Sequence, residues 1–268
     1  VTLTAPSVTK GYDGLTTYRV TSANLTSISS ALVGSDTVTA ATIIYTNKNV
    51  GSGDKTVTLS DISISDGNNG NNYTVTLAGN SSSSITRQTS VTWIGGSTGD
   101  WFNPANWAVT GNLSVAGAVP DLSNVSAVVI GSGKTVTFND SVAGITSPAS
   151  TGAVSITNLS GGGSLSVTNG SLSATSLNVV QLNTSVDTTI TTSTGITVAP
   201  ATGTTDTIAG VLAGNGTLTK NGAGTTVLSG ANTYTGGTNI NAGTLTLGAN
   251  NVLADTGAVN VSGGTLDI

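Results

Sequence analysis

A three-residue motif that recurs along the second half of the sequence constrains the fold more than any other feature. Gly-Thr-Leu, or its near copy Gly-Ser-Leu, stands at five places, and the last three copies begin 27 and then 21 residues apart. Short β-forming runs repeated every 20 to 50 residues or so are typical of solenoids, in which each repeat buries its inner face only against its neighbours. The copies begin at Gly163, Gly170, Gly216, Gly243 and Gly264.

Alternation within these runs predicts which side chains point into the solenoid, because successive residues of a strand face opposite sides. Thr and Asn between the inward positions are expected to face water or to stack from one repeat to the next. The inward candidates are Leu165, Val167, Leu218, Ile240, Leu245, Leu247, Val259, Val261, Leu266 and Ile268.

The composition favours β-structure and excludes most catalytic and metal chemistry. The 268 residues include no Cys, Met or His, and all 12 acidic residues are Asp. Disulfides, zinc fingers, Cys or His nucleophiles and a Ser-His-Asp triad are therefore excluded, and a metal would need oxygen ligands alone. The long helix formers are scarce whereas Thr and Val are abundant, so we expect an all-β chain.

Residues 1–88 show the pattern of a small β-sandwich. Stretches with a period of two are separated by turn residues at intervals of roughly ten, which is typical of such a module. The run 66–72 is the richest turn, with Asp, Gly and Asn only. The alternating stretches are 1–4, 37–39, 56–59, 62–64 and 73–77.

Residues 89–120 differ in composition from their neighbours and contain all three Trp of the chain, Trp93, Trp101 and Trp107. Two interpretations are open. The indoles could stack on a carbohydrate ligand, or they could form a small core where the sandwich meets the first repeat. We favour the core, and we predict that at least two of the three are buried in a junction or cap between residues 1–88 and a β-helix of residues 121–268.

The stretch 214–245 closely resembles a known repeat. It includes Gly216-Thr217-Leu218-Thr219-Lys220, Gly222-Ala223-Gly224-Thr225, Leu228-Ser229-Gly230-Ala231-Asn232-Thr233-Tyr234-Thr235-Gly236-Gly237-Thr238 and Ala242-Gly243-Thr244-Leu245. These segments follow the order of the passenger-associated repeat of bacterial autotransporters. The resemblance implies a right-handed parallel β-helix that is exported to the bacterial surface.

The first unit resembles the Tyr-Asp-Gly domain of filamentous-haemagglutinin-like adhesins. Lys10-Gly11-Tyr12-Asp13-Gly14, Leu32-Val33-Gly34-Ser35-Asp36, Asn47-Lys48-Asn49-Val50-Gly51 and Gly70-Asn71-Asn72-Tyr73 occur in that family's order. Gly11 stands where an apolar residue is common, and Asn71-Asn72 add length before Tyr73. The two resemblances together imply a large secreted surface protein of a Gram-negative bacterium, of which this chain is a piece.

A non-enzymatic function therefore fits the sequence best. We expect an adhesin, or a structural component of the extracellular matrix or biofilm, displayed on a β-helical shaft. Its partner would be a cell-surface or matrix carbohydrate or protein. A self-assembling filament or surface-layer protein is the alternative, in which copies of the chain associate into fibres.

A polysaccharide-degrading β-helix enzyme is a more distant alternative. Glycoside hydrolysis needs two carboxyl groups roughly 5 to 9.5 Å apart. The predicted solenoid offers no two acidic residues close in sequence, and no Arg follows Arg87, so no catalytic residue is assigned. Its carboxylates are Asp121, Asp140, Asp187, Asp206, Asp255 and Asp267.

Calcium is the only cofactor for which the sequence offers candidate ligands. Asp61, Asp66 and Asn68 supply oxygens beside a Gly-rich turn, but their spacing fits neither an EF-hand nor a calcium-binding nonapeptide. An Asn-Gly loop at the end of the sandwich is the favoured interpretation, so no cofactor is expected.

Nucleic acid and membrane are not expected as partners. Seven basic residues are too scattered to neutralise a row of phosphates, and no apolar run approaches the length of about 18 residues that spans a bilayer. The basic residues are Lys10, Arg19, Lys48, Lys55, Arg87, Lys134 and Lys220.

Overall fold

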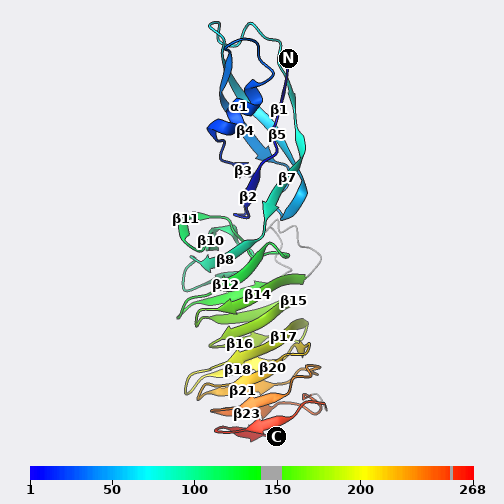
Figure 1. Cartoon of the computed structure of the whole chain (residues 1–268). Coiled ribbons are helices and arrows are strands. Elements are labelled where there is room, and N and C mark those ends of the chain that lie inside the picture. Colours follow the sequence, from blue (N-terminus) through cyan, green and yellow to red (C-terminus); the bar gives the residue numbers. More distant parts are fainter. Residues whose placement is uncertain (140–152, 254–255) are drawn as a thin grey trace. The chain divides into compact units, whose positions relative to one another are not determined.

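The computed structural model describes residues 1–139, 153–253 and 256–268, and the chain divides into two compact units, Val1–Arg87 and Gln88–Ile268 (Figure 1). The described part contains one α-helix and one short 3-10 helix, and all its other regular elements are strands. The prediction of an all-β chain is confirmed. No helix in the described ranges has the length and apolar character needed to span a membrane.

Residues 1–87 form a five-stranded sheet and a separate two-stranded sheet. The larger sheet has the order β2-β7-β5-β4-β3 and is antiparallel except between β2 and β7. In the smaller sheet β1 and β6 pair in parallel, with Leu3 opposite Leu77. The strands are β1 (Thr2–Thr4), β2 (Thr9–Gly11), β3 (Thr17–Tyr18), β4 (Thr37–Tyr45), β5 (Gly51–Ser65), β6 (Thr76–Ala78) and β7 (Asn80–Thr86).

The α-helix of this unit, α1 (Ser22–Ser29), was not predicted from the composition. A capping box starts it: the Thr21 hydroxyl accepts the Asn24 N–H at 3.3 Å, and the Asn24 side chain accepts the Thr21 N–H at 2.9 Å. Ile28 is buried on its inner face. Local capping and one buried contact thus form a helix in a segment whose neighbours favour strands.

Residues 88–268 contain two parallel ladders, and the chain alternates between them (Figure 1). The first ladder contains β8 (Gln88–Trp93), β12 (Val125–Val129), β14 (Ala153–Ser160), β17 (Thr188–Val198), β19 (Val211–Ala213), β20 (Thr217–Lys220), β22 (Thr238–Ile240) and β24 (Val259–Val261). The second contains β9 (Thr98–Asp100), β13 (Thr135–Asn139), β16 (Leu182–Thr184), β18 (Thr205–Ile208), β21 (Thr225–Leu228), β23 (Thr244–Leu247) and β25 (Thr265–Asp267).

Three further strands and the 3-10 helix complete this unit. The long strand β15 (Ser164–Val179) pairs within both ladders. Beside β8, the chain adds the antiparallel strands β10 (Trp107–Val109) and β11 (Asn112–Ala116), preceded by the 3-10 helix η1 (Pro104–Asn106).

The register explains the uneven spacing of the Gly-Thr-Leu copies. Thr244 pairs with Thr265 in the second ladder, so these two copies are equivalent. Thr217 lies instead in the first ladder, where its strand pairs with β17 and β22. The interval of 27 residues therefore crosses from one ladder to the other, whereas the interval of 21 is one true repeat.

The alternation correctly identified most inward residues. Leu165, Val167, Leu218, Ile240 and Leu245 are all at most 1% exposed. Leu247 and Leu266 are half-buried. The prediction was wrong for three positions, two of them in β24 and one directly after β25, because each of these strands pairs on only one side among the described residues. Those exposed residues are Val259, Val261 and Ile268.

Candidate functional site

Part of the outer face of the first ladder is hollowed and mainly polar. Two adjoining shallow hollows of about 280 and 300 Å³ lie over β15, β17, β20 and the turn between β19 and β20. Apart from Ala174 and Leu177, their lining consists of Ser, Thr, Gly and Asn, including Asn178 and Asn215, and no lining residue is charged. Neighbouring strands repeat at about 4.8 Å, so the hydroxyl and amide groups form a regular array suited to hydrogen bonding.

Inside the ladders, the Lys of the recognised repeat holds the corner of the chain together. Lys220 is 0% exposed, although its residue type is almost never fully buried without a partner. Its ammonium group donates to the carbonyl of Gly222 in the next corner and to that of Ala242 at 3.0 Å. Burial lowers the pKa of Lys220, while the charge of Asp206 opposes that shift. The role of this Lys is to satisfy carbonyls of two successive corners.

Two Asn residues of the repeat connect successive turns of chain. The buried Asn232 accepts the N–H of Leu212 at 2.7 Å and donates to the carbonyl of Val252 at 2.7 Å. Asn241 donates to Asn221 at 2.7 Å on the outside. These hydrogen bonds connect one repeat to the next.

Asp206 is buried inside the same region. It is 0% exposed, and neither carboxylate oxygen makes a hydrogen bond of normal geometry; the hydroxyl of its register partner Thr226 is likewise unpaired. Burial raises the pKa of the Asp206 carboxyl to about 6, opposed by the nearby Leu182 N–H, the Gln181 side chain and the charge of Lys220. Alternation could have located this residue, because it stands between two outward Thr.

The three Trp residues form a buried cluster. Trp101 and Trp107 are 0% exposed and Trp93 is 5% exposed. The ring centroids of Trp93 and Trp101 lie 5.1 and 5.2 Å from that of Trp107, edge to face. Trp101 also packs on Phe138, and its indole N–H donates to the carbonyl of Pro120 at 3.1 Å. Because the indole faces are covered, they offer no stacking surface to a sugar in this structure.

The calcium candidates build a loop instead of converging on one point. The carboxylate of Asp66 accepts backbone N–H groups from Asn68 at 2.9 Å, Gly70 at 2.8 Å and Asn72 at 3.1 Å. These bonds, led by that of Gly70, lower the pKa of Asp66. Asp61 accepts the hydroxyl of its neighbour Ser60. The described residues contain no group of three or more acidic side chains placed to hold a metal.

The solenoid carboxylates are found in different surroundings. Asp121 and Asp206 are buried, and the Asp121 carboxylate accepts the Asn124 side chain at 2.7 Å. Asp187 and Asp267 are exposed. Asp140 and Asp255 lie outside the described residues.

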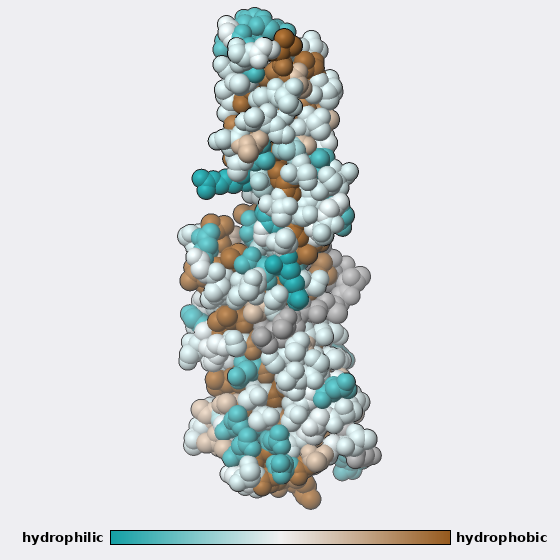
Figure 2. Space-filling model, viewed as in Figure 1, coloured by the Kyte–Doolittle hydropathy of each residue, from teal (hydrophilic) through white to brown (hydrophobic). Residues whose placement is uncertain are grey.

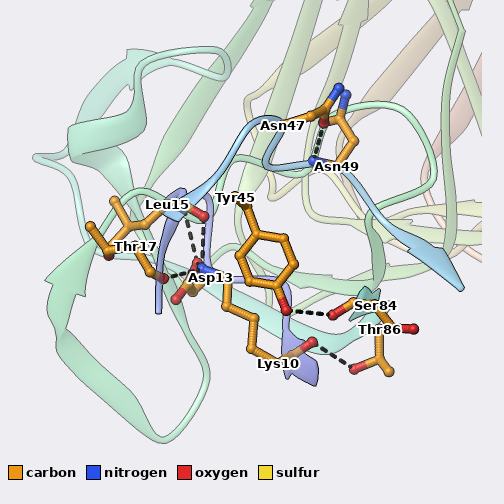
Figure 3. Close-up of polar contacts among 9 residues, drawn as sticks. All are labelled: Lys10, Asp13, Leu15, Thr17, Tyr45, Asn47, Asn49, Ser84 and Thr86. Atoms are coloured by element: carbon orange, nitrogen blue, oxygen red, sulfur yellow. Dashed lines mark hydrogen bonds and ion pairs between the residues drawn. The ribbon is translucent and has the colours of Figure 1, made fainter. Parts of the chain in front are cut away.

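The Tyr-Asp-Gly motif belongs to a polar cluster in the first unit (Figure 3). The Lys10 ammonium donates to Asp13 at 2.7 Å and to the carbonyls of Leu15 and Thr17, and it lies 5.7 Å from the ring centroid of Tyr45. The Tyr45 hydroxyl lies 2.9 Å from the carbonyl oxygen of Ser84. Burial raises the pKa of Tyr45 to about 12.

This cluster connects the loop after β2 to β4 and β7, which indicates a structural role for the motif. Tyr12 is fully buried and Gly14 has a φ of 77°, a conformation that favours glycine. Sequence comparison located Tyr12, Asp13 and Gly14. Nothing in the spacing alone indicated that Tyr45 completes the cluster.

The geometry thus defines a β-repeat protein whose motif residues hold neighbouring strands together. Residues 218–247 and 242–268 match the Passenger-associated-transport-repeat, and residues 1–83 match the YDG domain. The chain is similar to the Adhesin BmaC autotransporter of Brucella suis biovar 1 (strain 1330), with 35% identity over 142 residues. That region covers 48% of this chain and 4% of the relative. No solved structure matches the chain.

These findings confirm the resemblance stated from the sequence. The chain combines a YDG domain with passenger repeats of the autotransporter type. It spans only a small fraction of the adhesin's length.

Proposed function

We propose that this chain is a secreted, non-enzymatic segment of a bacterial surface adhesin, in which residues 121–268 form a right-handed parallel β-helix that displays polar faces. The parallel register of successive strands carries the proposal, because the chain returns to the same ladder after each excursion through the other. Connections between parallel strands of one sheet are right-handed in nearly all proteins. The sandwich of residues 1–88 and the Trp-bearing junction of residues 89–120 complete the proposed organisation.

Ligand contact is assigned to the hollows over β15 and β17, and the ligand would be a polar cell-surface or matrix molecule. Their hydroxyl and amide lining supplies donors and acceptors without a charged group. Catalysis is not favoured there, because bond cleavage needs positioned acids or bases. The buried Asp121 and Asp206 could not reach a bound chain of sugars.

The test is adhesion of beads coated with the purified chain to host cells and to immobilised matrix polysaccharide. We expect saturable binding that free chain competes away. Asn178→Asp together with Asn215→Asp, which introduces charge into the hollows, should reduce binding at least tenfold. The exposed substitution Asn112→Asp in β11 serves as the matched control.

Equal adhesion by the double variant would contradict the assignment of the surface. Release of new reducing ends or unsaturated sugars would contradict a non-enzymatic function. Association of the chain into fibres without any ligand would favour the filament instead.

A further inference from the structure

One edge of strand β5 has no partner over half of its length. On one side β5 pairs with β4 from Tyr45 opposite Val57 to Thr37 opposite Ser65. On the other side its pairing with β7 ends where Val57 faces Asn80. All of residues 1–87 are described, and none of their strands pairs with this second edge from Thr58 to Ser65. Such an edge exposes backbone groups that can pair with another chain.

The edge is open because the preceding strand turns away. β6 directly precedes β7 and could have continued beside β5, but it pairs with β1 instead. At Gly79, between β6 and β7, the chain still passes close to β5, since a Cβ there would lie 2.7 Å from the carbonyl oxygen of Val57. Asp61, with a φ of 50°, accompanies a shift in register between β5 and β4.

The space between the two strands is a groove of about 490 Å³ that is lined by apolar and polar residues alike. Ile62 and Ile64 of β5 line one side, and Val75 and Leu77 line the other, with Asn69 and Asn71 among the remaining lining residues. Val75 is 37% exposed and Leu77 is 42% exposed. Figure 2 shows apolar side chains gathered on the surface near the N-terminus, beside a hydrophilic loop.

Acidic and basic residues lie toward opposite ends of the strands of this unit. Asp61 and Asp66 flank the groove within β5 and directly after it, and the backbone N–H groups around Asp66 stabilise its ionised form. The basic residues Lys10 and Lys48 lie at the opposite end of the strands, since Lys10 is opposite Ile85 and Lys48 precedes the start of β5 at Gly51. Lys55 lies in the first half of β5, opposite Ser83. The two carboxylates therefore flank the groove along β5, while the amino group of Val1 lies on the β6 side, where it donates to the carbonyl of Thr74 at 2.7 Å.

We propose that this groove binds an extended, positively charged strand of a partner protein, which adds to the free edge of β5 and places alternate apolar side chains among Ile62, Ile64, Val75 and Leu77. Strand addition combines main-chain hydrogen bonds with pockets for alternate residues. The two carboxylates along β5 select basic residues at the positions between those side chains. This site adds a peptide ligand to the proposed function and does not depend on the hollows of the first ladder.

The experiment uses the whole chain and a short fluorescent peptide of alternating Val and Lys, with binding followed by anisotropy. We expect saturable binding that is at least tenfold tighter than that of the matching Val-Glu peptide and that weakens with added salt. A Val-Lys peptide with N-methyl groups on alternate residues keeps the side chains and charge but cannot pair along one edge. It should bind at least tenfold more weakly.

Leu77→Arg should abolish binding of the Val-Lys peptide. Val186→Arg is the matched control, because Val186 is 71% exposed and lies in the second unit. Circular dichroism at rising temperature checks that both variants fold. Equal binding of the N-methylated or Val-Glu peptide, or unchanged binding by Leu77→Arg, would overturn the proposal.

Displacement of the peptide by a neutral oligosaccharide would overturn the proposal and identify the groove as a sugar site. Self-association of the chain that Leu77→Arg abolishes would overturn it and identify a second copy of the chain as the occupant. None of these readouts involves cells or matrix, so failure here is distinguishable from failure of the adhesion assay.

Discussion

Individual polar residues inside the repeats explain why the motif has its particular sequence. Lys220 and Asn232 satisfy backbone groups that the turning chain would otherwise leave unpaired. A buried polar group without a partner costs about 1 to 3 kcal/mol. Asp206 differs from them because its carboxylate oxygens lack normal hydrogen bonds. The repeats therefore contain both well-satisfied polar residues and one costly carboxylate.

Asp206 makes stability depend on pH. Its folded-state pKa is raised from 3.8 to about 6, so the folded chain binds more protons in that range and the free energy of unfolding falls as pH rises through it. Each pKa unit corresponds to about 1.4 kcal/mol, so the loss reaches about 3 kcal/mol. Asp206→Asn should abolish this loss, as measured by urea unfolding at pH 4 and pH 7.

The exposed substitution Asp187→Asn is the control and should leave the difference between the two pH values unchanged. If the free energy of unfolding of Asp206→Asn still falls by the same amount between pH 4 and pH 7, another group causes the pH dependence.

At the scale of the elements, glycine sets how closely successive turns of chain approach. A Cβ at Gly222 would lie 2.1 Å from the carbonyl oxygen of Pro200 and 2.2 Å from the backbone carbon of Ala199. Contacts this short with backbone atoms cannot be relieved by rotating a side chain. The Gly-Ala-Gly segment of the repeat is therefore a packing requirement between neighbouring corners.

Gly222→Ala should destabilise the second unit by about 1 to 3 kcal/mol, because the added methyl group forces the corners apart. Gly131→Ala is the matched control, since no atom lies within 4 Å of its Cβ position. Guanidinium unfolding of both variants measures the difference. Equal stabilities would show that the corners can separate without cost.

At the scale of the whole molecule, the chain comprises two units with different pairing. Residues 1–87 contain mostly antiparallel strands, whereas residues 88–268 pair mainly in parallel and each strand contacts its nearest repeats. Stability in such repeats is roughly the sum of local and neighbour terms. The two units are therefore expected to unfold independently.

Calorimetry of the chain should show two separate transitions. A shortened chain of residues 88–268 should keep one of them at an unchanged temperature, because its core residues come from its own strands. A single transition, or loss of folding in the shortened chain, would show that the units stabilise each other.

The sequence predicted the fold class and most of the inward residues, for physical reasons. Scarce helix formers and strict alternation identified the all-β class and inward residues such as Leu165 and Ile240. The Trp candidates illustrate the limit, because an indole can pack in a core or stack on a sugar, and burial in the structure distinguishes the two. The helix at Ser22–Ser29 was missed because a cap outweighed composition.

The sequence by itself determined the chemistry that is absent and the repeat family, since both depend only on residue types and their order. The tertiary structure alone decided which ladder each Gly-Thr-Leu copy joins and where strand β5 keeps a free edge. Strand pairing joins residues far apart in the chain, and local alternation carries no information about which partner a strand takes.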